Sequence, residues 1–482
     1  MKGEQKRIAI VGAGIAGLST AYYLSKLSQQ GGQPMQITLL EKEGRLGGSI
    51  LTEGADGFLM EGGPDCFISE KPWALKLCKE LGLEKEVIGT NQQARRTFIL
   101  WGGQLHEIPE GFMLLAPTSL WPFVRSSLFS LPGKLRMGLD LILPRKKSDT
   151  EESLAAFVRR RLGREALERI AEPLVAGIHA GDPETMSLQS TFPRFIDLEQ
   201  EHRSLIWGMR QRKKQFANIR ARYTMFITLK DGMEGMISAL EQALPRGIIS
   251  LGGEVVGLEK IQAKPAGKPL YRLQTKGRNK ALEADAVILA APAFAAARLL
   301  QGMDNNIAHQ LNTIPYCSTA TVNLAYERSH IGHPLDGYGF VVPRLEGRRI
   351  MAATFSSVKF AGRAPQGKVL LRCFVGGAKN EELVSWGDDK LAAAVKGDIA
   401  EILSIEGEPR HVRICRWEKA MPQYTVGHEE RLSHIERGLS KHPGLFLTGS
   451  AYRGIGISDC VHQGELIAGA VLGFFQDGAN SK

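Results

Sequence analysis

Three glycine-rich stretches, far apart in the chain, have the residue types and spacing that bind phosphate groups through the backbone. In the first, Gly12, Gly14 and Gly17 follow the apolar run 8–11 with the spacing G-x-G-x-x-G. Gly12 permits a tight turn, Gly14 lets the backbone approach a pyrophosphate, and Gly17 lets the next helix pack closely on the sheet. Because the N-terminus of that helix faces the anion, this stretch predicts a dinucleotide site.

An acidic residue gives the dinucleotide prediction more weight. Glu41 stands at the end of the next apolar run, 37–40. A carboxylate at the end of the second strand can accept hydrogen bonds from a ribose and repels a 2′-phosphate. The pairing of this carboxylate with the first glycine stretch therefore predicts a dinucleotide without a 2′-phosphate.

The two other glycine clusters favour a flavin dinucleotide over a nicotinamide one. The first continues from Arg45-Leu-Gly-Gly48 to Gly62-Gly63-Pro64, and the second spans 448–459 and opens a helix. Such turns suit backbone contacts to the second phosphate, the ribityl chain and the ring, so the predicted cofactor is FAD. The predicted contacts to it are Gly12, Gly14, Ile15, Ala16, Gly17, Glu41, Lys42, Arg45, Gly47, Gly48, Gly62, Gly63, Pro64, Gly449, Gly456 and Ile457.

Hydrophobic periodicity predicts the elements that must position these turns. Residues 7–42 have the pattern of one β-α-β unit, and 112–205 is mostly helical with proline punctuation. Short strands are expected over 246–291, and longer ones at 317–326, 337–342, 350–355 and 368–375. A last strand near 444–449 precedes a helix from about 459 to 475.

Composition and charge limit the class of protein. The chain has 482 residues, 43% hydrophobic and 23% charged, which is typical of globular proteins and excludes a wholly disordered, collagen-like or membrane-embedded chain. This length predicts two domains with insertions. Lys and Arg outnumber Asp and Glu by 61 to 51, a net charge of +10. No nucleic-acid motif accompanies this excess, so we expect a polyanionic small molecule or an acidic membrane surface instead.

The chain shows no export or spanning signal, which predicts a cytoplasmic protein. The apolar run 8–11 is too short for a signal-peptide core, and 286–292 and 466–475 are shorter than a spanning helix needs. The segment 114–143 mixes apolar and basic residues and is compatible with a peripheral membrane contact at the inner face. The six cysteines contain no C-x-x-C pair, so we expect reduced thiols without a metal role.

Several further motifs carry a family resemblance that runs from Ile8 to about Phe475. The sequence resembles the FAD-dependent porphyrinogen oxidases of the amine-oxidase-like flavoprotein superfamily, and within them the Gram-positive-type coproporphyrinogen III oxidases. The motifs are Glu172-Pro-Leu-Val-Ala-Gly-Ile-His-Ala-Gly-Asp-Pro183, Ser187-x-x-Ser-Thr-Phe192, Arg363-Ala-Pro365, Gly376-Gly377, Arg416-Trp417 and Met421-Pro-Gln-Tyr-x-Val-Gly-His428.

The resemblance implies an α/β fold in three parts. The first is a discontinuous FAD-binding Rossmann-like (GR2-type) domain over 1–90, 225–296 and 436–482. The second is a mixed-sheet substrate domain over 91–111, 206–224 and 297–435, and the third a helical lid or membrane-contact domain over 112–205. The implied activity is oxidation of coproporphyrinogen III to coproporphyrin III, with molecular oxygen reduced to hydrogen peroxide. Ferrochelatase is the implied downstream partner.

The resemblance also assigns roles to single residues. It implies that the Val256 backbone lies near the adenine, that the Gly177 carbonyl orients the pyrrole N–H groups, and that Val341 and Phe374 keep the faces of the macrocycle apolar. Plant and animal relatives carry an arginine for a substrate propionate where this chain has Thr97. Lys71 is the expected substitute.

The reaction explains why no catalytic triad or carboxylate pair is needed. Each step removes a hydride from a bridging carbon, which the flavin accepts, and a proton from a pyrrole nitrogen. The protein must supply an apolar slot, a polar acceptor and dry surroundings. We expect His179 to be a structural residue at a helix end.

Four alternatives remain open from the sequence. The nearest is oxidation of protoporphyrinogen IX, which has two propionates where coproporphyrinogen III has four. An amine oxidase or a carotenoid desaturase would use the same scaffold, although the surroundings of Cys460 lack the pattern of a covalent flavin site. A non-catalytic escort protein like the GDP-dissociation inhibitors would share the fold without flavin, but the intact glycine motif and Glu41 argue against it.

Overall fold

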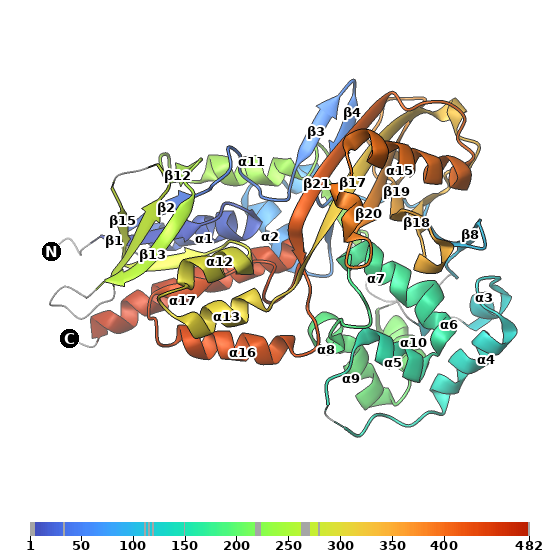
Figure 1. The fold of residues 1–482 in the computed structure, drawn as a ribbon, viewed down its shortest axis with the longest axis horizontal. Coiled ribbons are helices and arrows are strands. Elements are labelled where there is room, and N and C mark those ends of the chain that lie inside the picture. The colour runs from blue at the N-terminus through green and yellow to red at the C-terminus, as the bar shows by residue number, and fades with distance from the viewer. Residues whose placement is uncertain are drawn as a thin grey trace.

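The fold is seen in a computed structural model of the chain (Figure 1). It describes residues 5–31, 34–109, 112–113, 116–117, 120–148, 150–216, 223–261, 270–277 and 280–480. Residues 114–115 and 118–119 of the expected membrane-facing segment lie outside the described residues.

A five-stranded parallel sheet forms one end of the molecule, at the left of Figure 1. The predicted β-α-β unit is confirmed as β1 (Lys6–Val11), α1 (Ile15–Gly31) and β2 (Met35–Leu40), because these apolar runs can be buried on both faces of a sheet. The strand order is β12-β2-β1-β16-β22. The other strands are β12 (Ile249–Ser250), β16 (Ala286–Leu289) and β22 (Leu445–Leu447).

Helices cover both faces of the parallel sheet. Alternate residues of β1 enter separate cores: Ile8 and Ile10 pack with one set of helices, Ala9 and Val11 with another. The predicted C-terminal helix is present and longer than expected, and it packs along α1. The first set is α1, α2 (Pro72–Glu80), α11 (Glu234–Ala243) and α17 (Ile457–Asn480); the second is α12 (Ala293–Leu300), α13 (Asn305–Asn312) and α16 (His428–Leu439).

A seven-stranded mixed sheet forms the second large layer, in the order β21-β17-β20-β19-β18-β7-β8. The four strands predicted between 317 and 376 are all present, within two residues of the predicted ends. One face packs against α15 (Asp388–Leu403). The strands are β7 (Arg96–Trp101), β8 (Gln104–Glu107), β17 (Tyr316–Glu327), β18 (Gly337–Val341), β19 (Ile350–Phe355), β20 (Lys368–Gly376) and β21 (His411–Pro422).

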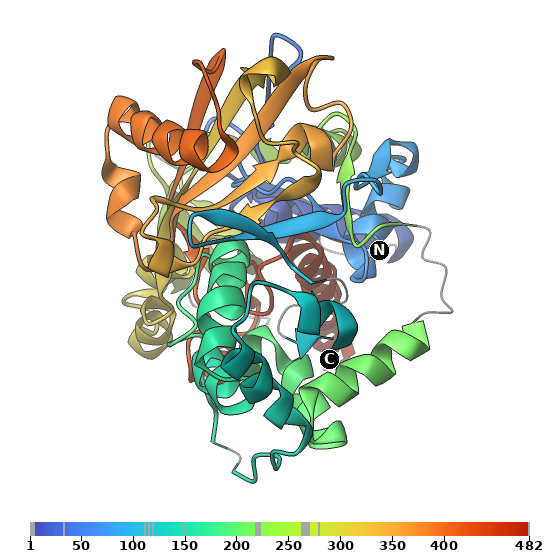
Figure 2. The same ribbon diagram turned by 90° about the vertical axis from the view of Figure 1, so that its right-hand side faces the viewer.

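A group of helices lies below the mixed sheet, as Figure 2 shows from the side. Its own apolar core reaches Val341 and Ala352 of the sheet, so the two layers are packed together. The helices are α3 (Leu120–Arg125), α4 (Leu131–Gly138), α5 (Leu154–Arg161), α6 (Arg164–Ala166), α7 (Glu172–His179), α8 (Leu188–Thr191), α9 (Pro193–His202) and α10 (Leu205–Phe216), with the short strands β9 (Phe112–Met113) and β10 (Ala116–Pro117) beside them.

Smaller elements complete the described chain. The small sheets contain β3 (Thr52–Ala55), β4 (Phe58–Glu61), β5 (Phe67–Ile68), β6 (Val87–Gly89), β11 (Phe226–Leu229), β13 (Val255–Ile261), β14 (Leu270–Thr275) and β15 (Leu282–Ala284). The remaining helical turns are α14 (Ser356–Lys359) and the segments Glu84–Glu86, Leu139–Leu141, Leu167–Ala171, Arg328–His330, Arg344–Glu346 and Glu381–Ser385. None of the described helices is both long enough and apolar enough to cross a membrane.

The structure gives this α/β architecture without fixing the predicted domain limits. The parallel sheet, the mixed sheet and the helices of 120–216 each have a separate apolar core. The residue boundaries of the three predicted domains stay a prediction.

Candidate functional site

The first glycine turn lies where three parallel strands end. β1, β16 and β22 finish at Val11, Leu289 and Leu447, and ligands of open parallel sheets bind beyond such carboxyl ends. Gly12 has a φ of +103°, and a Cβ there would lie 2.6 Å from the Ala290 carbonyl oxygen. Only glycine therefore fits this turn.

The other two glycines of the motif differ in their surroundings. A Cβ at Gly17 would lie 1.9 Å from the Gly12 carbonyl oxygen, so a side chain there would break the turn. A Cβ at Gly14 would meet no atom of the described chain within 4 Å. The chain thus packs against Gly17 and leaves the side of Gly14 open, where the predicted pyrophosphate would approach.

The second glycine cluster joins the first through the backbone. Gly47 pairs with Gly14 in an isolated bridge and donates its N–H to the Ala13 carbonyl at 2.9 Å. Arg45 supports the turn by donating from Nη1 to the carbonyls of Leu46, at 3.1 Å, and Ile50, at 3.0 Å. Ile15 and Ala16 begin α1 directly beyond this junction.

Glu41 braces the glycine turn in the structure. One of its carboxylate oxygens accepts the Ala13 N–H at 2.7 Å, and the other accepts the Glu43 N–H at 3.0 Å. Lys42 is exposed and pairs with Glu43 at 3.2 Å. The Val256 side chain is also exposed, while Gly253, on the same stretch, donates its N–H to the Glu41 carbonyl at 2.7 Å. Contacts of Glu41 with a ribose and of Val256 with an adenine stay predictions.

Side chains of the mixed sheet hold the segment Gly62-Gly63-Pro64. Thr321 Oγ1 and Trp417 Nε1 both donate to the Gly62 carbonyl, at 2.7 and 2.8 Å. A Cβ at Gly63 would lie 1.6 Å from the Ser49 carbonyl oxygen, so this segment is packed directly against the second glycine cluster. The two sheets therefore meet at these glycines.

The C-terminal turn closes the same region. Gly449 has a φ of +125°, and a Cβ there would meet nothing within 4 Å. The Thr448 hydroxyl next to it is buried and has no hydrogen-bond partner in the described part of the chain. Gly456 and Ile457 begin the turn into α17, where a Cβ at Gly456 would lie 3.1 Å from an Asp459 oxygen.

Lys71, the predicted propionate ligand, lies at this C-terminal turn. Its Nζ is 2.7 Å from both carboxylate oxygens of Asp459, and its side chain is 45% exposed. Its charge is therefore compensated by a carboxylate of the chain, which the sequence analysis did not foresee. The arginines next to Thr97 point elsewhere: Arg95 and Arg96 are exposed, and Arg96 pairs with Asp336 at 2.5 Å.

The structure brings together the three residues predicted to touch the macrocycle. A Cβ at Gly177 of α7 would lie 3.3 Å from a Val341 methyl group and 3.7 Å from Ala352. Ala352 is in register with both Val341 and Phe374 on the neighbouring strands. These four residues lie where α7 packs on the mixed sheet and are called the substrate wall below, after the macrocycle contact that the resemblance implies; that contact stays a prediction.

His179 ends α7, as the sequence analysis predicted. Burial, together with the Lys71 charge, lowers the pKa of His179 to about 4. The imidazole is therefore neutral at pH 7, and its ring packs edge-on to Phe192 at 5.4 Å between centroids.

A cluster of charges that the sequence did not reveal lies beside the substrate wall, made of the buried Arg372 and the partly buried Asp65 and Lys359. Lys359 Nζ lies 2.9 Å from Asp65, and Arg372 Nη1 lies 3.7 Å from it. Burial alone would raise the pKa of Asp65, but the charges of Lys359 and Arg372 hold it well below its usual range. One signal was present: Arg372 interrupts an apolar strand two residues before Phe374, which puts both on one face.

Metal chemistry finds no support in the described part of the chain. None of its clusters of three or more His, Cys, Asp or Glu side chains could hold a metal ion. All six cysteines are free; Cys66 is half-buried and the other five are buried.

The fold and the joined glycine turns define a dinucleotide-binding oxidoreductase of the flavoprotein class. The chain belongs to the flavin containing amine oxidoreductase family, whose profile matches residues 15–472. The resemblance stated from the sequence is thereby confirmed, and the cofactor of this chain is FAD.

Within this family, the chain is similar over nearly its full length to several porphyrinogen oxidases. The chain is 37% identical to the coproporphyrinogen III oxidase of Bacillus subtilis (strain 168), over 96% of this chain and 97% of that protein. It is 30% identical to the chloroplastic protoporphyrinogen oxidase of Nicotiana tabacum, over 96% of this chain and 85% of that one. A crystal structure from Exiguobacterium sp. 255-15, assigned as a protoporphyrinogen oxidase, superposes with a TM-score of 0.85 at 33% identity, over 97% and 99% of the two chains.

The residues present fit an FAD. The open sides of Gly14 and Gly449 would hold its backbone-bound groups, and the buried Thr448 hydroxyl still lacks a partner. Both features lie at the carboxyl ends of the parallel strands, where a dinucleotide is expected.

Proposed function

We propose that the chain oxidises coproporphyrinogen III to coproporphyrin III with FAD and molecular oxygen. The observation that carries the proposal is the apolar substrate wall built by Gly177, Val341, Ala352 and Phe374 next to the FAD-binding glycine turns. Full-length similarity to coproporphyrinogen III oxidases supports the choice of substrate.

The bound FAD supplies the hydride acceptor. The residues of the chain do the rest: the substrate wall excludes water and holds the flexible macrocycle with one bridging carbon toward the cofactor. The Gly177 carbonyl is the proposed acceptor that orients the pyrrole N–H groups. His179, being neutral at pH 7, places no competing charge at this end of α7.

The overall chemistry is balanced by dioxygen. Each turnover takes a hydride from a bridging carbon and a proton from the macrocycle, and these two electrons and two protons convert one dioxygen to hydrogen peroxide. Over the three turnovers two of the protons leave pyrrole nitrogens and one leaves the fourth bridging carbon by tautomerisation, because the porphyrin keeps two N–H groups. Three turnovers aromatise the macrocycle, so each porphyrin formed should release three peroxide molecules.

The test compares two substrates on flavin-loaded protein in air. Coproporphyrinogen III should give porphyrin fluorescence and peroxide with a kcat/KM several-fold above that for protoporphyrinogen IX. The reverse ranking would favour the second candidate, protoporphyrinogen IX oxidation, which the tobacco relatives support. Protein that releases no flavin on denaturation, or that oxidises neither substrate, would contradict the proposal.

The FAD assignment has its own variant test. Gly14→Val should abolish flavin retention, because the valine would occupy the open side of the turn without clashing with the described chain. Gly397→Val in α15 is the matched control, since that glycine is exposed and a Cβ there would likewise meet no described atom within 4 Å outside its own helix. Flavin absorbance after gel filtration reads the result, and retained flavin in Gly14→Val would contradict the assignment.

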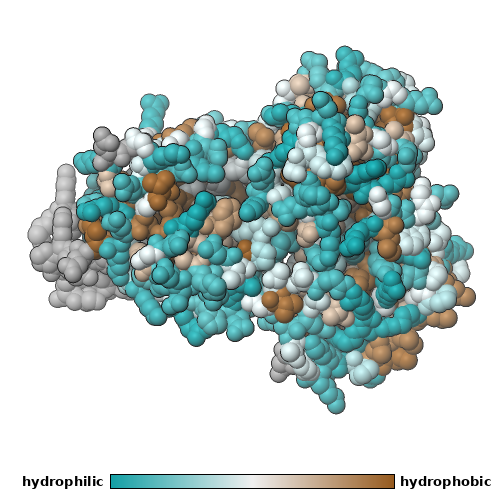
Figure 3. Space-filling view, viewed as in Figure 1, coloured by the Kyte–Doolittle hydropathy of each residue, from teal (hydrophilic) through white to brown (hydrophobic). Residues whose placement is uncertain are grey.

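A peripheral contact with an anionic membrane at the cytoplasmic face is a further part of the proposal. Hydrophobic side chains gather at the lower right of Figure 3, over α3 and α4. Leu131 and Leu135 are 71% and 68% exposed, far more than core leucines. The apolar face consists of Trp121, Val124, Leu131, Leu135, Leu139, Leu141 and Ile142, with Arg125 and Lys134 among them.

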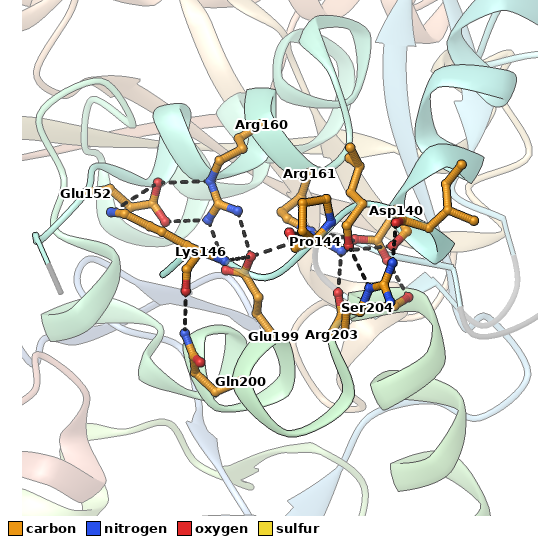
Figure 4. Close-up of polar contacts among 12 residues, drawn as sticks. Asp140, Pro144, Lys146, Glu152, Arg160, Arg161, Glu199, Gln200, Arg203 and Ser204 are labelled. Atoms are coloured by element: carbon orange, nitrogen blue, oxygen red, sulfur yellow. Dashed lines mark hydrogen bonds and ion pairs between the residues drawn. The ribbon is translucent and has the colours of Figure 1, made fainter. Parts of the chain in front are cut away.

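Two arginines donate hydrogen bonds to backbone carbonyl groups of the loop that carries part of this apolar face. Arg161 donates to the carbonyls of Asp140, Leu143 and Pro144, at 2.8, 3.4 and 3.0 Å, and Arg203 donates to Ile142 at 2.7 Å (Figure 4). A loop whose carbonyls are bonded internally can enter an apolar phase at little cost. This supports insertion of Leu141 and Ile142 into lipid.

Vesicle sedimentation tests the membrane contact. Binding to phosphatidylglycerol vesicles should exceed binding to phosphatidylcholine, and Leu131→Ser with Leu135→Ser should reduce the bound fraction by more than half. Leu345→Ser is the control, because Leu345 is 62% exposed outside the apolar face. Equal loss in the control, or no binding by the wild type, would contradict the contact. Ferrochelatase stays a predicted partner.

A further inference from the structure

The face of the mixed sheet that carries the substrate wall has a polar row beside the apolar one. Residues two apart on a strand share a face and lie about 7 Å apart. Arg372 lies two residues before Phe374 on β20 and therefore on the same face of the sheet. It is in register with Asn323 on β17 and with Thr354 on β19. The rim of a macrocycle lying on the wall therefore faces this polar row.

Arg372 is almost completely buried but only partly bonded. Its guanidinium stacks on the Phe374 ring at 4.7 Å, and its Nη2 donates to the Gly63 carbonyl. Its side chain is 4% exposed, yet Nε has no hydrogen-bond partner among the residues that the structure describes. The neighbouring Asn323 likewise leaves Oδ1 without a partner. Buried polar atoms are rarely left unpaired, so this row faces a group that the chain does not itself supply.

The charges around Arg372 leave a positive excess. Asp65 is the carboxylate between Lys359 and Arg372, and the Asp65 charge raises the pKa of Lys359 although burial alone would lower it. Arg363, also buried, faces Glu61 and Asp65. These five groups, of which Glu61, Arg363 and Arg372 are buried and Asp65 and Lys359 partly buried, comprise three cations and two carboxylates; the exposed Asp231 also faces Arg363. A ligand carboxylate would balance the charge.

We propose that Arg372, with Lys359 next to it, binds a carboxylate of the substrate and thereby selects for a tetracarboxylate. The inference rests on the proposed function. Guanidinium N–H groups match carboxylate oxygens in geometry, and the unpaired Nε–H supplies the donor. Asp65 keeps Lys359 and Arg372 in place without exhausting their charge.

The position of this cluster explains a preference for four carboxylates over two. Gly377, three residues after Phe374, contacts Ala180 next to His179, and the charge of Lys71 reaches His179. Arg372 lies on the other side of Phe374 along β20. Coproporphyrinogen III carries a propionate on every pyrrole and can reach both ends, whereas the two propionates of protoporphyrinogen IX lie on adjacent pyrroles and reach one end at a time.

Binding and kinetics of flavin-loaded variants test the inference. Arg372→Met should raise the KM for coproporphyrinogen III, and the Kd for coproporphyrin III, about tenfold or more, with kcat within about twofold. The same change should affect protoporphyrinogen IX less, so the preference between the two should shrink. Arg372→Lys keeps the positive charge but loses the paired N–H groups of the guanidinium, so it should restore part of the affinity. This variant replaces Arg372→Met in the test if the methionine variant does not fold.

The matched control is Arg413→Met. Arg413 is in register with Asn323 in the same polar row, but it is half-exposed and pairs with Glu53. Its loss removes the same charge from the same row and should leave both constants within about twofold. Equal effects of the Arg413 and Arg372 variants, or no effect of Arg372→Met, would overturn the inference. Failure of the wild type to oxidise or bind any porphyrinogen would instead overturn the proposed function.

Discussion

Two buried arginines, one in the helical layer and one in the mixed sheet, are bonded in opposite ways. Arg161 on α5 is fully buried, and all three of its nitrogens donate, to Asp140 and to the carbonyls of four residues (Figure 4). Arg372 on β20 is nearly as buried, but its Nε has no partner. The hydrogen bonds of the first arginine are all made within the protein, whereas we expect those of the second to be satisfied only when a ligand binds.

The difference teaches how to separate structural from functional buried charge. A charge removed from water is costly unless hydrogen bonds replace its hydration. At Arg161 the chain supplies every bond, so nothing remains for a ligand. At Arg372 the chain supplies an aromatic ring, one carbonyl and a shared carboxylate, so a donor remains.

The largest expected effect is on Arg161. Arg161→Met should lower the free energy of unfolding by about 3–5 kcal/mol, because it leaves Asp140 buried without its ion-pair partner. Urea unfolding at pH 7 measures the change. A loss below about 1 kcal/mol would contradict the view that this arginine holds the helical layer together. Arg164→Met, at an exposed pair with Glu168, is the control and should leave the stability almost unchanged, because water screens that pair.

Arg372→Met should cost less stability than Arg161→Met. Asp65 keeps its 2.9 Å ion pair with Lys359, so we expect a loss of about 1–2 kcal/mol. Added ligand separates the two variants further. Coproporphyrin III should raise the Tm of Arg161→Met as much as that of the wild type, but it should raise the Tm of Arg372→Met much less. Equal ligand shifts in all three proteins would break the distinction between the two arginines.

The last expected effect concerns a buried histidine and develops only as the pH falls below about 6.5. His428 stacks on Tyr424 and bonds the Tyr452 carbonyl at 3.0 Å, and burial lowers its pKa to about 4. The unfolded chain therefore binds more protons between pH 6.5 and 4, and stability falls as the pH falls through that window. His428→Gln should remove about 1–3 kcal/mol of this pH dependence, measured as unfolding free energy at pH 7 and pH 4.5. An unchanged slope would contradict the assignment.

Much of the fold could be predicted because its elements follow local patterns. The apolar runs of β1 and β2 and the glycines between them specify a β-α-β unit whatever surrounds them. The strands from 316 to 376 were also recognisable, since alternation of apolar residues needs only local sequence. The order of strands in the mixed sheet was not predictable, because β7 joins β18 across 236 residues or more.

Only the part of the site that is formed by backbone groups, the glycine turns, could be predicted from the sequence. The roles of Gly12, Gly14 and Gly17 can be predicted from their spacing. By contrast, the charged cluster comes from three separate segments and forms only in the folded chain; its members are Asp65, Lys359 and Arg372. The pairing of Lys71 with Asp459, 388 residues away, could not be foreseen for the same reason. Side-chain clusters depend on tertiary register, which one sequence does not reveal.

The packing of α17 on α1 bears on the order in which the protein is made. Gly464 of α17 lies so close to α1 that a Cβ there would be 2.9 Å from that of Ser19 and 3.1 Å from the Ala16 carbonyl oxygen. The first glycine turn leaves the ribosome long before the turn at 448–457. The nascent chain therefore cannot enclose its flavin until this second turn has been made, and until then the β-α-β unit lacks the helix that covers it.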